Sequence, residues 1–153
     1  MLELLSPAVS PEAVIAAVQN GADAIVIRFG GSAAADFTEE DFFKAVRYCR
    51  IRACRVYAEL DSLLWDDEFE AAASLAIRSS EAGISAMVVQ DPGLAAVLRT
   101  VVPDMELHAG ERMGFHSLSG VEAAAEMGFS RVRLPLEMSG AEIAFIASRA
   151  SIP

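Results

Sequence analysis

The chain has 153 residues, of which 12 are basic and 22 acidic, so its formal net charge is −10. This length suits one domain with a sizeable core. The acidic balance argues against nucleic-acid binding by this segment and against binding to an anionic membrane, because both reward clustered Lys and Arg. Lys44 is the single lysine of the sequence, which excludes a lysine-rich patch.

Patterns typical of strands and of helices alternate along the whole chain. Strands are expected at residues 2–5, 22–29, 55–60, 86–90, 106–109 and 131–136. Helices are expected at residues 12–20, 39–52, 67–81, 92–102, 118–127 and 140–151. Ser10 followed by Pro11 is a typical helix start, and Gly21 a typical helix stop. A loop of small residues, 30–36, follows the second strand.

Six consecutive βα units predict one α/β domain over residues 1–153 with a parallel sheet and right-handed crossovers. Two architectures compete. An open doubly wound sheet is complete with about six strands, whereas a TIM barrel has eight units, two more than this chain holds. Polar residues recur on one parity of most strands, as in Arg55, Tyr57 and Glu59. A sheet covered on both faces would be apolar on both parities, so we expect an incomplete TIM-barrel-like sheet.

The same parity predicts a candidate site inside the curved sheet, with one polar residue from each strand. The inward set is Glu3, Arg28, Glu59, Gln90, His108 and Arg133. Glu59 and His108 are the candidate catalytic groups, because a carboxylate and an imidazole can transfer a proton. The substrate-binding candidates are Glu3, Arg28, Gln90, Asp91 and Arg133. Their charges suit an anionic or zwitterionic ligand. The alternative is that buried opposite charges simply pair, and that Asp91 serves the turn at Asp91-Pro92-Gly93.

Other kinds of site find little support in the residues. Cys49 and Cys54 match neither a C-x-x-C pair nor a zinc knuckle, and we expect reduced thiols. The pair His108 and His116 lacks the spacing of a zinc helix, so neither a metal site nor a cofactor is predicted. No signal peptide and no apolar run of membrane-spanning length is visible in the sequence. A cytoplasmic protein without membrane contact is expected.

Several short motifs together resemble the collagenase-like peptidases, peptidase family U32. They are Leu4-Leu5-Ser6-Pro7-Ala8, Asn20-Gly21-Ala22-Asp23-Ala24, Val89-Gln90-Asp91-Pro92-Gly93, Leu107-His108-Ala109 and Gly128-Phe129-Ser130-Arg131-Val132. The resemblance implies the amino-terminal barrel half of a longer protein. It implies a peptidase of unassigned catalytic type, or a relative that hydroxylates RNA bases or ubiquinone, some of which carry an iron–sulfur cluster. The family's cluster cysteines lie downstream, so Cys49 and Cys54 do not inherit that role.

Our first functional interpretation is therefore the amino-terminal segment of a collagenase-like peptidase, not catalytic by itself and acting on a peptide or small molecule. The alternatives are a hydroxylation protein of RNA in the same family, and a diverged module that binds a small ligand or assembles with itself. An incomplete barrel leaves two strand edges open, and open edges favour self-association. We therefore also expect a homo-oligomer.

Overall fold

The computed structural model describes residues 3–28 and 37–153 and contains one parallel sheet. The predicted small-residue loop 30–36 lies outside these ranges. The strands are β1 (Leu5–Ala8), β2 (Ala24–Arg28), β3 (Arg55–Leu60), β4 (Ala86–Val89), β5 (Glu106–Ala109) and β6 (Arg131–Val132). The helices are α1 (Pro11–Gln19), α2 (Glu39–Ile51), α3 (Phe69–Ala82), α4 (Pro92–Val101), η1 (Glu111–Met113), α5 (Leu118–Glu126) and α6 (Gly140–Ala147).

Local sequence signals set where the helices begin and end. In five helices a side-chain oxygen of the N-cap residue accepts a hydrogen bond from a backbone N–H of the first turn. These N-cap residues are Ser10, Thr38, Asp91, Ser117 and Ser139. Gly83, directly after α3, has φ +87, a left-handed conformation that glycine adopts at low cost. The chain then turns sharply enough to enter the next strand.

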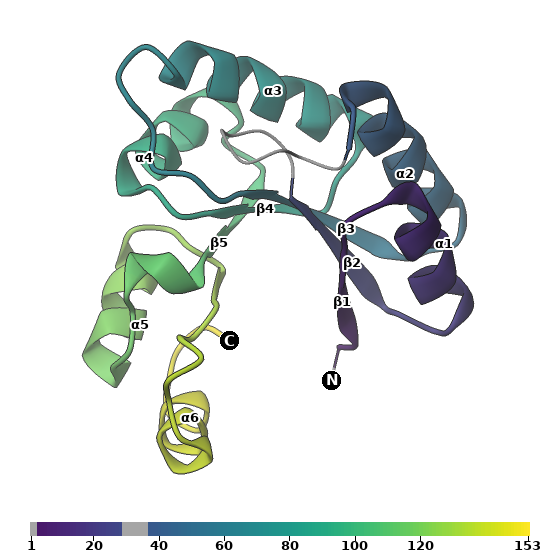
Figure 1. Ribbon diagram of the computed structural model, residues 1–153. Coiled ribbons are helices and arrows are strands. Elements are labelled where there is room, and N and C mark those ends of the chain that lie inside the picture. The colour runs from purple at the N-terminus through teal and green to yellow at the C-terminus, as the bar shows by residue number, and fades with distance from the viewer. Residues whose placement is uncertain (1–2, 29–36) are drawn as a thin grey trace.

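The six strands are paired in sequence order, β1-β2-β3-β4-β5-β6, and every pair is parallel. A doubly wound sheet reverses its strand order at a switch point, and this sheet has none. Figure 1 shows the sheet as an arch, with α1 to α5 on its outer side, α6 at the foot of the arch below the end of the sheet, and both chain ends on its open side. The prediction of an incomplete TIM-barrel-like sheet is therefore confirmed.

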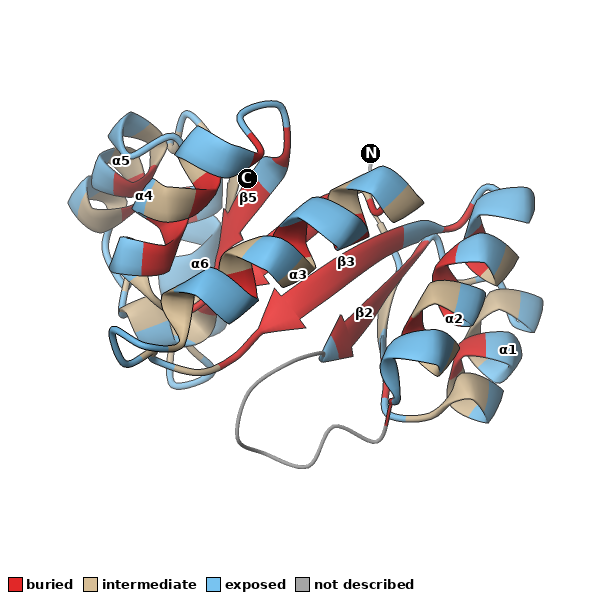
Figure 2. Cartoon of the chain, turned by 90° about the horizontal axis from the view of Figure 1, so that it is seen from above, coloured by how far each residue is buried: buried red, intermediate tan, exposed pale blue. Residues whose placement is uncertain are grey.

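The two parities of each strand lead to two different environments. The outward parity packs under the helices and forms the large core, with Ile25, Val56, Met87 and Leu107 among its members. Figure 2 shows the strands buried beneath helices whose outer surfaces are exposed. The inward parity carries only a small apolar layer, Ala24, Val26, Tyr57, Ala86 and Val88. Most of the remaining inward positions are polar.

Two strands differ from the prediction. The first strand was predicted at 2–5, of which residue 2 lies outside the described residues, and it is observed at Leu5–Ala8. It continues through Pro7 because proline is tolerated in a strand at the edge of a sheet. The sixth is only Arg131–Val132 instead of 131–136, because Pro135 lacks the N–H that would continue the ladder. The backbone N–H of Arg133 still donates to Ala109 at 2.8 Å, so the start of the predicted extension keeps its place in the sheet.

The outer side of β6 is partly occupied by the chain itself. The N–H of Val132 donates to the carbonyl oxygen of Pro153 at 2.8 Å. Ser151 donates from its N–H and its hydroxyl to the Glu122 carboxylate at 2.9 and 2.6 Å, which holds this segment against α5. Among the described residues, no helix combines the length and apolar character needed to cross a bilayer.

Candidate functional site

Polar side chains from four strands or their ends meet at the carboxyl end of the sheet, on its concave face. Glu59 of β3 is 5% exposed. It accepts hydrogen bonds from Gln90 Nε2 at 3.3 Å and from Arg133 Nη1 at 2.9 Å. Arg133 also donates to Glu111 Oε2 at 3.2 Å. Three of the residues predicted to face inward, Glu59, Gln90 and Arg133, are thus brought into direct contact.

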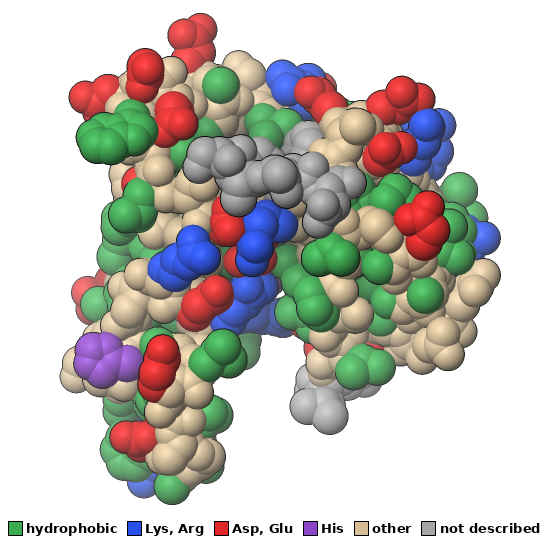
Figure 3. Space-filling view, viewed as in Figure 1, with side chains coloured by type: hydrophobic (Ala, Val, Ile, Leu, Met, Phe, Trp, Pro, Cys, Tyr) green, Lys and Arg blue, Asp and Glu red, His purple; other side chains and the backbone are tan. Residues whose placement is uncertain are grey.

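A second part of this cluster is built on Asp61, whose side chain is 7% exposed. Arg28 Nε lies 2.9 Å from Asp61 Oδ2, and Arg112 Nη1 donates to the Asp61 carbonyl at 2.8 Å. The two arginine side chains are 55% and 60% exposed. Figure 3 shows basic and acidic side chains gathered in the middle of this face. The carboxylate is buried while the guanidinium groups reach solvent, which suits an anionic ligand.

Sequence reasoning left Asp61, Glu111 and Arg112 outside the site. Their positions could have indicated a role, because each lies within three residues of the carboxyl end of β3 or β5, where barrel proteins place their functional groups. Glu111 and Arg112 belong to η1, and the N–H of Arg112 donates to Gln90 Oε1 at 2.9 Å. Gln90 therefore links η1 to Glu59.

The charge balance at Glu111 follows from the same contacts. Burial alone would raise the pKa of this carboxyl, but a backbone hydrogen bond and the Arg133 charge outweigh it and lower the pKa. Glu111 is therefore ionised at neutral pH and remains paired with Arg133.

His108 of β5 occupies a different position, beside a cavity of about 310 Å³ inside the arch. Its ring packs edge-on against Tyr57, with centroids 4.9 Å apart. Burial, reinforced by the charges of Arg131 and Arg133, lowers the pKa of His108 to about 4. The ring is therefore neutral at pH 7, and its 3.7 Å contact with Glu106 is not an ion pair at that pH. A neutral imidazole can donate one hydrogen bond and accept another.

The structure does not pair the two predicted catalytic residues with each other. In the strand register Glu59 lies opposite Val88, and Val88 lies opposite His108. Two strand spacings therefore separate them, about 10 Å between their backbones. The nearest charged partner of Glu59 is Arg133. This arrangement does not favour direct proton transfer between Glu59 and His108. Their catalytic roles therefore stay predictions.

Glu3 lies at the opposite, amino end of the strands. Its carboxylate accepts from the Tyr57 hydroxyl at 2.6 Å and from Arg131 Nη1 at 2.6 Å, and it lies 2.6 Å from Arg55 Nη2. Burial alone would raise the pKa of Glu3, but the Tyr57 hydrogen bond and Arg131 outweigh it and lower the pKa. This network joins the starts of β3 and β6 to the residues before β1. In barrels the amino end is typically a region of stability.

Asp91 has a local structural role in addition to any functional one. Its Oδ1 accepts from the N–H of Leu94 at 3.0 Å, which caps α4. Its Oδ2 accepts from the N–H of Leu64 at 3.2 Å, which fixes the loop between β3 and α3. Both oxygens are thus used by the fold, as expected for a turn residue at a helix start.

The residues present do not fit the iron–sulfur cluster that some members of the resembled family carry. Within residues 3–28 and 37–153, no group of three or more His, Cys, Asp or Glu side chains could hold a metal ion. Cys49 and Cys54 are both buried. Burial, together with the neighbouring Cys54, raises the pKa of Cys49 to about 12, so its thiol is protonated and a poor ligand or nucleophile.

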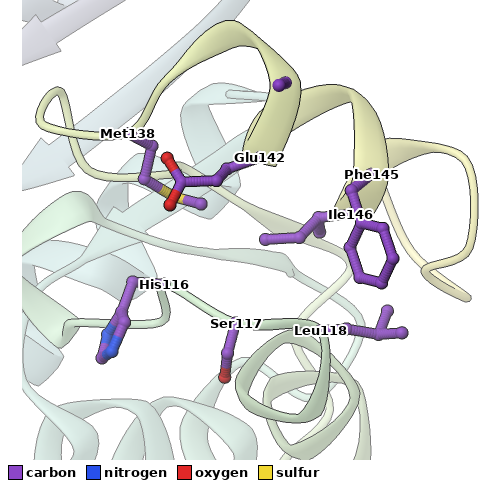
Figure 4. Close-up of a pocket in the computed structure, with 8 residues that line it drawn as sticks. His116, Ser117, Leu118, Met138, Glu142, Phe145 and Ile146 are labelled. Atoms are coloured by element: carbon purple, nitrogen blue, oxygen red, sulfur yellow. The ribbon is translucent and has the colours of Figure 1, made fainter.

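A further cavity of about 410 Å³ lies between the start of α5 and the inner side of α6. Figure 4 shows His116, Ser117 and Leu118 on one side of it and Met138, Glu142, Phe145 and Ile146 on the other. The side chains of Ser117 and Glu142 are engaged in helix capping. None of the predicted site residues lines this cavity, so the concave face remains the candidate site.

Comparison with known proteins identifies one matching family and several similar proteins. The model of peptidase family U32 matches residues 9–153. A 23S rRNA 5-hydroxycytidine synthase of Escherichia coli is 30% identical over 141 residues, 90% of this chain and 21% of that protein. The tRNA hydroxylation protein P1 of Bacillus subtilis is 28% identical over 145 residues, 92% of this chain and 34% of that protein.

A collagenase of Porphyromonas gingivalis is also similar, with 26% identity over 126 residues, 79% of this chain and 29% of that protein. The solved structure of a U32 peptidase superimposes with a TM-score of 0.79 over 99% of this chain and 66% of that one, at 17% identity. This second likeness is one of fold. The chain spans 21–34% of the length of these three curated relatives.

Proposed function

This chain belongs to peptidase family U32, as its motifs indicated, and from that premise we propose that it forms the RNA-binding half-barrel of a longer RNA-hydroxylation protein. Two of the relatives described above are named for hydroxylation of rRNA or tRNA. They give no support to the expectation that this segment takes no part in nucleic-acid binding. That expectation rested on net charge, which averages over the whole surface and hides a local group of arginines.

The observation that carries the proposal is the pair Arg28 and Arg112 on the buried Asp61. Both arginine side chains are more than half exposed, whereas the Asp61 side chain between them is 7% exposed. An RNA phosphate would meet positive charge there, in a molecule that is otherwise acidic. A guanidinium group can bind two phosphate oxygens at once, and Asp61 fixes the direction of both arginines before RNA arrives.

The other residues of the cluster serve as the support of this surface. Glu59 and Gln90 hold Arg133 and η1 in place through the contacts described above. His108, neutral and facing the inner cavity, offers a hydrogen bond to an uncharged ring such as a nucleobase. In this proposal phosphates lie at the rim and a base enters the arch.

The test measures binding of a fluorescein-labelled single-stranded RNA of twelve nucleotides by fluorescence anisotropy, at several salt concentrations. We expect the double variant Arg28→Gln/Arg112→Gln to bind more weakly. Each lost phosphate contact should also reduce the slope of log K against log salt by about 0.7, hence about 1.4 for the pair. The matched control is Arg78→Gln, because Arg78 on α3 is about half exposed and paired with Glu39 at 2.9 Å. Equal binding by the double variant and the control would refute the proposal.

A peptidase role is the second candidate, because the collagenase relative covers 79% of the chain and guanidinium groups also bind carboxylates. The same assay separates the two functions by competition. A peptide with a free terminal carboxylate should displace RNA only weakly if RNA is the ligand. Strong displacement by that peptide, lost when its terminus is amidated, would favour the peptidase.

A further inference from the structure

We propose that the loop between β3 and α3 is a docking surface for a basic protein segment, with Trp65 and Leu63 as its apolar centre. These side chains are 79% and 72% exposed. They lie two residues apart in a loop at the carboxyl end of β3. Exposed aromatic side chains of this size are typical centres of protein interfaces, and nothing in the proposed RNA-binding role uses them.

The loop holds these side chains outward on a fixed backbone. The N–H of Trp65 donates to Glu68 Oε2 at 2.8 Å, and the N–H of Glu68 donates to the Trp65 carbonyl at 2.9 Å. Leu64, between the two exposed residues, packs against the main core, and its N–H donates to Asp91. Because the backbone is already ordered, a partner would bind Trp65 without a large entropic cost for the loop.

The charges around Trp65 select the chemistry of the partner. Asp66, Asp67 and Glu70 follow within five residues and are exposed. Figure 3 shows hydrophobic side chains among acidic ones at the upper corner, where Figure 1 places the β3–α3 loop. Arginine or lysine side chains could pair with these carboxylates and stack on the indole ring.

The same charges disfavour RNA and a second copy of this chain as occupants of this surface. RNA would bring phosphates against three exposed carboxylates, and the same loop of a second copy would bring three more carboxylates against them. We therefore assign the surface to a segment of another protein that is rich in arginine and apolar residues.

Trp65 is the single tryptophan of the sequence, so the intrinsic fluorescence of the chain reports on this surface. We would titrate the unmodified chain with a twelve-residue peptide of alternating Arg and Leu and follow the emission of Trp65. A saturable shift of the emission to shorter wavelength is expected with this peptide. A peptide of alternating Glu and Leu and the twelve-nucleotide RNA should leave the emission unchanged.

Variants then separate the apolar contribution from the charges, using the labelled Arg–Leu peptide in an anisotropy assay. Trp65→Ala should lower the affinity about thirtyfold, as for a central interface residue. Asp66→Asn/Asp67→Asn should lower it about fivefold. The matched controls are Ile51→Ala, another exposed apolar residue at the end of α2, and Glu39→Gln/Glu40→Gln, which removes the same charge elsewhere. Both should bind normally.

Three outcomes would overturn the proposal. The first is a shift of Trp65 emission by RNA and not by the Arg–Leu peptide, which would make Trp65 a base-stacking platform. The second is equal binding of the Arg–Leu and Glu–Leu peptides. The third is an affinity of Trp65→Ala equal to that of Ile51→Ala. None of these outcomes depends on Arg28 or Arg112, so this inference can fail without the RNA-binding proposal.

Discussion

At the scale of single residues, His108 couples the stability of the fold to pH. Its pKa is about 4 in the folded chain, against an ordinary value of 6.5. Because the folded pKa is lowered, the neutral ring stabilises the fold above pH 6.5, and this contribution is lost as pH falls toward 4. The difference corresponds to about 3 kcal/mol. Urea denaturation at a series of pH values should show this loss.

The variant His108→Gln is the control for this prediction. It should remove most of the pH dependence between 6.5 and 5. Glu3 and Glu111, whose pKa values are lowered in the fold, should still cause a loss of stability below about pH 4.5. An unchanged pH profile in His108→Gln would show that the ring is not the titrating group.

The variant Gly110→Ala tests how tightly the candidate site is packed. A Cβ atom at this position would overlap the side-chain amide of Gln90, and Gln90 is 2% exposed. The φ of Gly110 is −77, an ordinary value, so Gly110→Ala meets steric crowding and no backbone strain. We expect a loss of about 1–3 kcal/mol of unfolding free energy and weaker RNA binding, because Gln90 must leave Glu59 or Arg112.

Gly140→Ala provides the matched comparison, because nothing lies within 4 Å of its added Cβ. It begins α6, and alanine is the better helix former. This variant should be neutral or slightly more stable. An equal loss in both variants would mean that Gln90 is not held as the structure describes.

At the scale of elements, the strands were predictable because alternation of side chains along a strand is a local property. Glu59 and Arg133 were both assigned to the interior from their own strands. Their 2.9 Å contact joins residues 74 positions apart and depends on the register of the sheet, which no local pattern contains. For the same reason the sequence did not show that Val88 stands between Glu59 and His108.

The amino-end network yields a prediction at this scale. Glu3 ties β3 and β6 to the start of the chain through Tyr57, Arg55 and Arg131. Glu3→Gln should lower the unfolding free energy by about 2 kcal/mol, because it removes charge-assisted hydrogen bonds. RNA binding per folded molecule should not change. A loss of binding without a loss of stability would instead support Glu3 as a substrate-binding residue.

The control for this prediction is Glu39→Gln, which breaks the exposed pair with Arg78. It should lower the unfolding free energy by less than about 1 kcal/mol.

At the scale of the whole molecule, the arch has two unequal edges. The β6 edge is partly capped, since Val132 donates to Pro153. β1 pairs only with β2 among the described strands, and the exposed Leu4 and Val9 flank it. Self-association, which the open sheet led us to expect, should therefore proceed through β1.

Light scattering over a range of concentrations tests this expectation. The unmodified chain should show a mass above that of the monomer. Leu4→Lys/Val9→Lys should lower it, because lysines beside an edge strand oppose pairing with a second copy. Ile51→Lys adds charge at the end of α2, a helix that packs on β3, and should leave the mass unchanged. A monomer at every concentration would mean that Pro7, which removes one N–H from β1, is enough to keep this edge unpaired.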